Sequence, residues 1–415
     1  MTRLHGPFHQ LLPMTDLRAR GPLSDADLPI ISEGGILEQH GKIVATGKFE
    51  RLRRERPTAE VIEVEGKQTV LPGFVDCHTH ICFGGNRIDD FAKRNAGVPY
   101  LEIARAGGGI KSSVRHTRAA SEAELTELTR QRLTELLERG ISTVEVKTGY
   151  GLDVENELKM LRAIRAAGEG SAARVVPTCL AAHVVPPEFT DAASYCTYIL
   201  SELVPTITRE QLCTRFDIFV EDTAFNEEVA RTYLTELKRL GFDLTVHADQ
   251  FSAGGSRVAV EVGARSADHL EASGAAEIEL LSRSEVVPVA LPGASLGLGM
   301  AFTPARRLLD AGCSLAIASD WNPGSAPMGD LLTQAGILAT YEKLTIAEVL
   351  AGISVRAATA LGLTDGTGTL GRGAPADFFT YPTGDYRELV YRQGRLQPSG
   401  GWVGGVRVVG EEAFL

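Results

Sequence analysis

The sequence predicts an α/β protein with a (β/α)8 TIM-type barrel and a small β-sandwich domain formed by both chain ends. Between residues 69 and 365, short apolar runs alternate with charged stretches of helical pattern, which is typical of parallel strands joined by crossover helices. Residues 1–68 and 366–415 instead show short alternating runs separated by glycine turns. A chain of 415 residues also suits one large barrel with an appended module.

The barrel is expected over residues 69–365, with one strand for each apolar run. The eight runs lie at 69–75, 141–146, 174–180, 216–220, 242–246, 265–267, 286–291 and 313–318. Between them lie amphipathic helices, of which 121–138 and 227–240 have clear patterns. Ser121 followed by Glu124 is typical of a helix start, and Gly140 indicates where that helix ends.

The two chain ends are expected to form one β domain, built from residues 1–68 and 366–415. In the first segment, alternating runs at 42–45 and 61–64 are flanked by turn glycines. In the second segment, the same pattern of short alternating runs recurs at 377–381, 388–391 and 402–409. Because no internal repeat or long linker interrupts the chain, we expect a compact arrangement.

Composition limits the partners of the protein. A net charge of −11, without clustered Lys and Arg, argues against a surface for nucleic acid or anionic membranes. No apolar stretch approaches the roughly 18 residues of a membrane span. The six cysteines form no CxxC pair, and no secretory signal is visible at the N-terminus. We therefore expect a cytoplasmic protein that acts on a small molecule, with a local arginine to bind it if it is anionic.

Four residues at the ends of the predicted strands have the chemistry of metal ligands. His78 and His80 follow the first run, and alternate residues of a strand share a face, so both imidazoles can point the same way. His247 ends the fifth run and Asp320 follows the eighth, at the rim where barrel enzymes hold their active sites. Because catalytic metals keep a position open for water, these residues predict a centre that activates water.

Long motifs in the chain resemble those of the amidohydrolase superfamily. Its opening signature is similar to Leu71-Pro72-Gly73-Phe74-Val75-Asp76 with His78 and His80, and its closing signature to Gly368-Thr369-Leu370 with Gly373 and Ala376-Asp377. Within the superfamily, nearly the whole chain is similar to the imidazolonepropionase family. The strings that carry this resemblance are Phe83-Gly84-Gly85-x-Arg87, Ala106-Gly107-Gly108-Gly109-Ile110, Val144-Glu145-Val146-Lys147-x-Gly149-Tyr150-Gly151-Leu152, Ala182-His183-x-Val185-Pro186-Pro187, His247-Ala248-Asp249-Gln250, Ser266-Ala267-Asp268-His269-Leu270-Glu271 and Asp320-x-Asn322-Pro323-Gly324-Ser325.

The resemblance implies a reaction. A metal-activated water would hydrolyse the cyclic amide of 4-imidazolone-5-propanoate to N-formimidoyl-L-glutamate, a step of histidine degradation. It also implies substrate contacts from Tyr150 and His183, and a homodimer. We expect one divalent or trivalent ion per chain, Zn or Fe, between which the ligand set does not choose.

Other residues have chemistry suited to this reaction. Asp320 is placed to move a proton from the attacking water to the leaving ring nitrogen. His269, after the sixth strand, is a second candidate, either as general base or as donor to the oxyanion. Arg87 offers a fork of donors for the propanoate carboxylate, unless it is a surface ion pair. The turn of Asn322, Gly324 and Ser325 offers amides and a hydroxyl for the same carboxylate, unless it is a plain turn.

Two residues bear on related chemistries. Gln250 stands three residues after His247, where ring deaminases of the superfamily carry Glu; as a substrate ligand, Gln can form hydrogen bonds but cannot carry a proton. Lys147 follows the second run, where some relatives carry a carbamylated Lys that bridges two metals; we favour one metal. His5, His9, His40 and His116 have no partners at ligand spacing and are expected to be solvated surface residues.

Two alternatives remain open to the sequence. The chain can be another ring hydrolase or deaminase of the superfamily, acting on hydantoin, dihydroorotate or a nucleobase. Gln250 argues against a deaminase, and the lack of a clear second set of metal ligands argues against the others. An inactive homologue that serves as a binding or scaffold protein would have lost ligands, whereas all four are present here.

Overall fold

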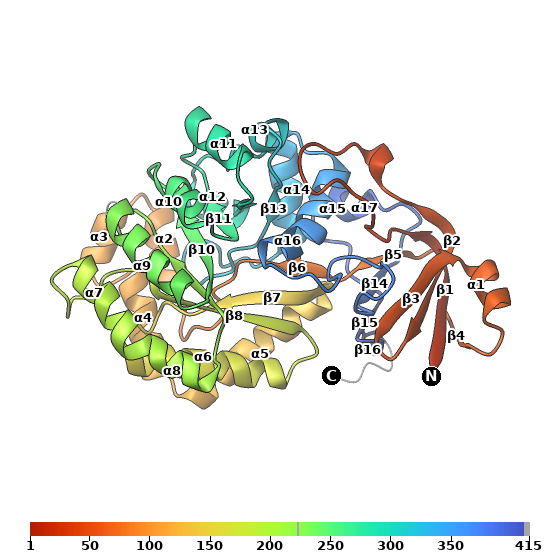
Figure 1. Ribbon diagram of the computed structural model, residues 1–415, viewed down its shortest axis with the longest axis horizontal. Helices are drawn as coiled ribbons and strands as arrows, with labels where there is room; N and C mark the ends of the chain where they lie inside the picture. Colours follow the sequence, from red (N-terminus) through yellow and green to blue (C-terminus); the bar gives the residue numbers. More distant parts are fainter. Residues whose placement is uncertain (222–223, 411–415) are drawn as a thin grey trace.

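The protein folds into a parallel barrel and a mixed sheet to which both chain ends contribute (Figure 1). The structure is a computed structural model and describes residues 1–221 and 224–410. Within these ranges, no helix has the length and apolar character needed to cross a membrane.

The barrel strands confirm the predicted α/β architecture. In the described part of the chain eight parallel strands pair in sequence order, namely β6 (Phe74–Asp76), β7 (Ile141–Lys147), β8 (Arg174–Ala182), β9 (Arg215–Ile218), β10 (Asp243–Ala248), β11 (Ser266–His269), β12 (Val287–Ala290) and β13 (Ala316–Ile317). The segments that follow β13 and β6 close the ring, because Asp320 N donates to His78 O (3.0 Å) and His80 N donates to Trp321 O (2.9 Å). Barrel closure thus occurs at the predicted metal ligands.

Helices connect the strands around the barrel. They are α2 (Ile88–Asn95), α3 (Tyr100–Arg105), α4 (Ile110–Ala119), α5 (Glu122–Glu138), α6 (Val154–Glu169), α7 (Ala192–Tyr198), the π-helix η2 (Ile199–Leu203), α8 (Val204–Glu210), α9 (Glu227–Arg239), α10 (Gly255–Val262), α11 (Ala275–Ser282), α12 (Pro292–Leu298), α13 (Ala305–Asp310), α14 (Leu331–Glu342), α15 (Ile346–Gly352) and α16 (Val355–Ala360). The predicted start of α5 is confirmed, since Ser121 Oγ accepts from Glu124 N (3.2 Å) and Glu124 Oε2 accepts from Ser121 N (2.8 Å).

The mixed sheet joins the two chain ends, as predicted. Its strands are β16 (Val406–Val409), β15 (Gly400–Val403), β14 (Phe378–Tyr381), β5 (Thr69–Pro72), β1 (Thr2–Leu11), β2 (Ile31–Gln39) and β3 (Lys42–Lys48) in spatial order, with β4 (Glu60–Glu63) also paired to β1. Three short helices accompany this part of the chain, namely the 3-10 helix η1 (Asp25–Asp27), α1 (Phe49–Glu55) and α17 (Glu388–Tyr391).

Three predicted strands are corrected by the structure. The run 69–75 is two strands, because Gly73 separates β5 in the mixed sheet from β6 in the barrel. The run 388–391 is the short helix α17, and a run of four residues is too short for its pattern to distinguish the two. The run 402–409 is the hairpin β15–β16, because Gly404 and Gly405 have left-handed φ values of 56° and 75°, which tight hairpin turns require.

One predicted surface histidine is buried. The ring of His5 is 1% exposed and packs edge-on against Phe378 and Trp402, at centroid distances of 5.0 and 5.3 Å. Burial, together with the nearby charge of Arg3, lowers its pKa to about 3. Because this imidazole stays neutral, His5 can serve as an aromatic residue of the core. The polar residues around it in the sequence did not indicate that it is buried. His40 and His116 are exposed and His9 is half-buried.

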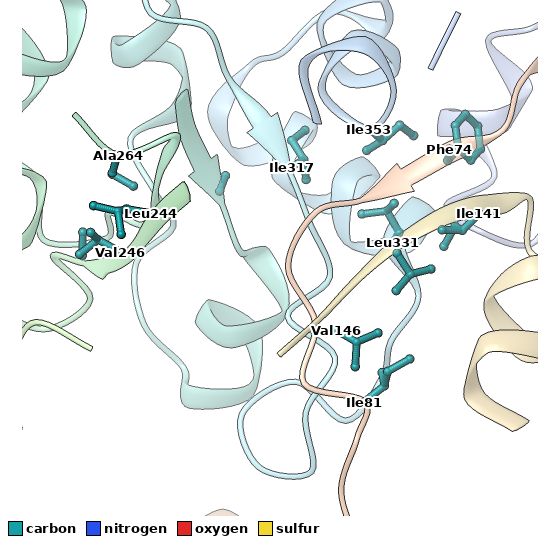
Figure 2. Close-up of a cluster of buried hydrophobic side chains, with 14 of the residues drawn as sticks. Phe74, Ile81, Ile141, Val146, Leu244, Val246, Ala264, Ile317, Leu331 and Ile353 are labelled. Carbon is teal, nitrogen blue, oxygen red and sulfur yellow. The ribbon is translucent and has the colours of Figure 1, made fainter. Parts of the chain in front are cut away.

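Buried aliphatic and aromatic side chains fill the space between the barrel and its helices. Figure 2 shows Phe74 of β6 and Ile141 of β7 close to Leu331 of α14, with Val146 and Ile81 nearer the end of the strand. Burial of this apolar surface fixes the positions of the strand ends. The polar groups at those ends are therefore held on a rigid frame.

Candidate active site and metal centre

Four side chains converge where the barrel closes, and they are the four predicted ligands. The Nε2 atom of His80 lies 3.2 Å from that of His78 and 3.3 Å from that of His247. Oδ1 of Asp320 lies 3.6 Å from His78 Nε2 and 3.4 Å from His80 Nε2. All four side chains are buried. A nitrogen-rich set with one carboxylate oxygen suits a transition metal such as zinc or iron.

The protonation of the histidines fits a bound cation. Burial, aided by the nearby charge of Lys147, lowers the pKa of His80 to about 3, and burial lowers that of His247 to about 4. Both rings are therefore neutral at neutral pH. Nδ1 of His78 donates to Asp268 Oδ2 (2.7 Å), and Nδ1 of His247 lies 2.8 Å from Asp217 Oδ2. The remaining Nε2 lone pairs face one another, which is unfavourable unless a cation lies between them.

Two further carboxylates, Asp217 and Asp268, support the ligands, although the sequence pattern predicts no role for them. Asp217 lies within β9 and Asp268 within β11, and both side chains are buried. A carboxylate within a predicted barrel strand, or directly after one, is the signal that could have found them, because a buried charge requires a partner. Their geometry is that of the outer carboxylates that orient metal-bound imidazoles.

Lys147 lies below the histidines at the end of β7 and is also fully buried. Its Nζ is 2.7 Å from Glu145 Oε2, 2.9 Å from Asp217 Oδ2 and 3.8 Å from Asp268 Oδ2. Although burial alone would lower the pKa of Lys147, the surrounding carboxylates raise it above its usual range. A carbamate on this nitrogen would add negative charge among three carboxylates. The surroundings therefore favour an ammonium, in line with the preference for one metal.

The turn after Asp320 holds that carboxylate in place. Nδ2 of Asn322 donates to Asp320 Oδ2 (2.9 Å), and Ser325 Oγ lies 3.4 Å from the same oxygen. The amides of Gly324 and Ser325 donate to Asn322 Oδ1 at 2.7 and 2.8 Å. These two amides, which were expected to bind a substrate carboxylate, therefore bind the Asn322 side chain within the turn.

His269 lies beside the ligands and has a carboxylate partner of its own. Its Nδ1 is 3.5 Å from Oε1 of Glu271, and the ring centroid is 5.2 Å from that of His247. Burial alone would lower the pKa of His269, but the charge and hydrogen bonding of Glu271, together with the charges of Asp320 and Asp268, raise that pKa. The backbone of His269 is left-handed (φ 83°), a conformation that costs about 1–3 kcal/mol and is concentrated at functional sites. Glu271 belongs to a motif of the sequence, but the pattern alone predicts no role for it.

Tyr150 and His183 stand on the same rim, next to His80. His183 stacks on His80 with a centroid distance of 5.4 Å, and Tyr150 lies 5.6 Å from His183. Nδ1 of His183 donates to Gly149 O (3.1 Å), which leaves Nε2 as an acceptor. Gly149 is required here because its φ is 109° and a Cβ would lie 2.8 Å from His183 Nδ1. Burial raises the pKa of Tyr150 above its usual range, so its hydroxyl stays protonated.

Arg87 lies in the wall of a cavity of about 400 Å³ that reaches the turn after Asp320. The cavity is lined by Phe83, Arg87, Arg132, Trp321, Asn322 and Gly324, among others. The guanidinium lies directly over Gly324, where a Cβ would stand 1.6 Å from Nη2. Its Nε atom is buried without a hydrogen-bond partner, and no ion pair with Arg87 occurs among residues 1–221 and 224–410.

Arg132 of α5 was not found from the sequence. Its guanidinium stacks on the ring of Phe83 at 3.6 Å and donates to the carbonyls of Ile81 (2.6 Å) and Phe83 (2.9 Å). Arg132 thereby fixes the loop that leads from the two histidines to Arg87. Gln250 is 8% exposed and lies in the loop after β10, where the buried carboxylate of Glu221 accepts from the amides of Phe251 (2.8 Å) and Ser252 (3.1 Å).

Comparison with known proteins identifies the family. Residues 69–408 match the model of the amidohydrolase family. The chain is 42% identical over 394 residues to an imidazolonepropionase of Rubrobacter xylanophilus, covering 93% of this chain and 94% of that protein. It is also 42% identical over 369 residues to an imidazolonepropionase of Deinococcus radiodurans, covering 89% and 90%. An adenosine deaminase from Xanthomonas campestris with bound zinc shares the fold, with a TM-score of 0.72 and 17% identity over 100% of this chain and 94% of that one.

The chain belongs to the amidohydrolase family of hydrolases. Within that family its place is with the imidazolonepropionases, whose identity to this chain extends over almost its full length.

Proposed function

We propose that the enzyme hydrolyses the ring amide of 4-imidazolone-5-propanoate to N-formimidoyl-L-glutamate, the imidazolonepropionase step of histidine degradation. The observation that carries the substrate assignment is the guanidinium of Arg87, which lies beside the metal-ligand turn with a buried, unsatisfied Nε. A carboxylate on a short chain attached to a flat ring is the complementary ligand, because guanidinium and carboxylate pair through two parallel hydrogen bonds. Phe83 and Trp321 give the cavity apolar walls suited to a flat ring.

We propose that His78, His80, His247 and Asp320 hold one zinc or iron ion per chain. Such an ion would supply a Lewis acid that lowers the pKa of a bound water toward neutrality and polarises the ring carbonyl. The convergent lone pairs of the histidines support this assignment. The paired ammonium of Lys147 supports a single ion, because a bridging carbamate would need that nitrogen.

Asp320 is assigned the proton transfer. Water adds to the ring carbonyl carbon and gives up a proton; the bond between that carbon and the ring nitrogen then breaks, and the nitrogen takes up a proton. Burial raises the pKa of Asp320, although His269 and His247 oppose that effect, so its carboxylate can hold a proton between the two steps. Asn322 and Ser325 hold its Oδ2 atom in a fixed position, which supports this proposed role. Gln250 cannot take this role, because an amide does not accept a proton at neutral pH.

His269 is assigned to the oxyanion that develops on the carbonyl oxygen. Because Glu271 lies on its Nδ1 side, Nε2 faces the ligand cluster, and the raised pKa keeps a proton available there. Tyr150 can donate its hydroxyl hydrogen, and Nε2 of His183 can accept from a ring N–H. With Arg87 on the propanoate, these residues would orient the ring. Gly324 permits that position of Arg87, and Gln250 is the remaining substrate contact that we propose. Asn322 and Ser325, which hold Asp320, would act on the substrate through that carboxylate.

A substrate panel tests this function. Purified protein of known metal content is incubated with freshly prepared 4-imidazolone-5-propanoate, hydantoin, dihydroorotate, guanine and cytosine, with absorbance followed and products identified by mass. We expect loss of the imidazolone alone, formation of formimidoylglutamate, and inhibition by a chelator that added zinc or iron reverses. Turnover of another ring, and not of the imidazolone, would overturn the substrate assignment.

Location and assembly are also proposals. The six cysteines are buried and unpaired, which supports a reducing, cytoplasmic environment. The resemblance supports a homodimer, which sedimentation of the purified protein would test.

A further inference from the structure

Lys147 lies between the carboxylates that hold two of the proposed metal ligands. Oδ2 of Asp217 is 2.9 Å from Lys147 Nζ and 2.8 Å from His247 Nδ1. Oδ2 of Asp268 is 3.8 Å from the same Nζ and 2.7 Å from His78 Nδ1. In both cases a single oxygen atom faces the ammonium on one side and the imidazole on the other. One ammonium is therefore connected to two histidines from different strands.

Electrostatic attraction to the Lys147 ammonium should hold the two aspartates firmly in position. Asp217, Asp268 and Lys147 are at most 1% exposed, and buried charges interact far more strongly than charges in water. Without the ammonium, two carboxylates on neighbouring parts of the barrel would face each other and repel. They would move apart or rotate, and each would move the imidazole that it contacts. Backbone and hydroxyl donors hold them in part, since Asp217 Oδ1 accepts from Ile218 N (2.7 Å) and Asp268 Oδ2 accepts from Thr245 Oγ1 (3.1 Å).

We propose that Lys147 is a positioning residue for the metal centre, in which one ammonium fixes both carboxylates that orient His78 and His247. Lys147 touches no ligand directly and acts through Asp217 and Asp268. The proposal rests on the proposed metal centre but not on the identity of the substrate. It competes with a simpler role, in which Lys147 only neutralises Glu145, its closest partner at 2.7 Å. Apart from Lys147, the Glu145 side chain contacts Thr178 and Arg215 and, within residues 1–221 and 224–410, no histidine, so the two roles can be separated.

The test measures metal binding rather than turnover. Zinc affinity is measured by competition with a chromophoric chelator, and ligand geometry is measured by the absorption spectrum of the cobalt-substituted protein. In Lys147→Met we expect zinc affinity to fall about 10- to 100-fold, as for other losses of outer-sphere support, with an altered cobalt spectrum. Lys147→Arg, which keeps the charge, should bind zinc more tightly than Lys147→Met. Lys159→Met is the matched control, because Lys159 is half-buried and donates to Arg118 O (2.8 Å), in no contact with the centre.

A charge-balanced variant keeps the test decisive if Lys147→Met does not fold. Lys147→Met with Glu145→Gln removes one charge of each sign and leaves both aspartates and all ligands in place. If Lys147 positions the histidines, this double variant still loses zinc affinity and still has an altered cobalt spectrum. If Lys147 only neutralises Glu145, the double variant binds zinc as tightly as the parent protein. Parental affinity and spectrum in the folded double variant would overturn the proposal, whatever substrate the enzyme uses.

Discussion

The metal side and the substrate side of the barrel mouth hold their charges in opposite ways. On the metal side, the charged groups beneath the ligands are buried and paired, with Lys147 shared between Asp217 and Asp268. On the substrate side, Arg87 is half-buried and has a buried Nε without a partner, and the adjoining helix α2 exposes Ile88 (68%) and Phe91 (46%). The paired charges hold the metal ligands in position before the substrate binds. The unpaired guanidinium of Arg87, in contrast, gains its partner only when an anionic substrate binds.

This contrast predicts that damage to the two sides has different kinetic signatures. Loss of a group on the metal side should lower kcat, because the reacting atoms lose a proton carrier or a correctly placed ligand. Loss of a group on the substrate side should raise KM, because binding is weakened before any bond breaks. The three predictions that follow test this distinction in order of decreasing effect.

Asp320→Asn should abolish hydrolysis while the fold is kept. An amide cannot carry the proton, and general acid–base catalysis contributes about 100- to 10,000-fold, to which weaker metal binding adds. We expect a fall in kcat of at least about 1,000-fold, measured by imidazolone absorbance, with an unchanged circular dichroism spectrum. Asn tolerates the left-handed φ of 50° at this position.

The control for that variant is Asp16→Asn. Asp16 is exposed and also has a left-handed φ, of 59°, so the same chemical change is made in a similar backbone conformation away from the site. Asp16→Asn should leave kcat and KM unchanged. Parental activity in Asp320→Asn would remove Asp320 from the reaction.

Arg87→Ala should act mainly on KM. Loss of a charge-assisted bidentate pair costs about 2–4 kcal/mol in kcat/KM, or about 30- to 1,000-fold. A substrate analogue in which the propanoate is replaced by a neutral amide is the internal control, because it cannot form the pair. Its kcat/KM should be low and nearly equal in the parent enzyme and in Arg87→Ala. An equal loss for both substrates would show that Arg87 supports the structure rather than binding the carboxylate.

The same contrast explains which parts of the site were predictable. His78, His80, His247 and Asp320 stand at strand ends, and strand periodicity brings strand ends to one rim of a barrel, so their convergence follows from sequence. Asp217 and Asp268 lie inside strands, where the pattern indicates burial but not which charge meets which histidine. Such pairings depend on the register between distant strands.

Local patterns also had limits at the junction of the two sheets. Residues 69–75 form one continuous apolar run, yet Gly73 lets the chain pass from the mixed sheet into the barrel. A Cβ at Gly73 would lie 2.1 Å from Ser142 Oγ, so the junction needs a glycine because of a residue far away in the sequence. The apolar pattern of the run does not reveal that contact. The turn of Asn322 to Ser325 was predicted as a group, but only side-chain geometry showed that Asn322 itself occupies its amides.

Gly324→Ala gives the smallest expected effect and the sharpest test of the substrate side. A Cβ at this position would stand 1.6 Å from Arg87 Nη2 and 2.1 Å from Cζ, so the guanidinium must move. A displacement of about 1 Å weakens bidentate pairing without abolishing it, and we expect KM to rise about tenfold with kcat nearly unchanged. The control Gly170→Ala, at φ −93° with no atom nearer than 3.7 Å, should have no effect.

The decisive comparison is the same glycine change in two backgrounds. If Gly324 matters because it leaves space for Arg87, then Gly324→Ala should add almost nothing to Arg87→Ala, since the displaced group is already gone. If residue 324 instead contacts the substrate directly, through its amide or because only glycine leaves room for the ring, the increases in KM caused by the two substitutions should multiply. Non-additive effects on KM, with kcat constant, would therefore establish that this side of the barrel mouth binds the substrate through the Arg87 guanidinium. They would also establish that the guanidinium takes its position because Gly324 has no side chain.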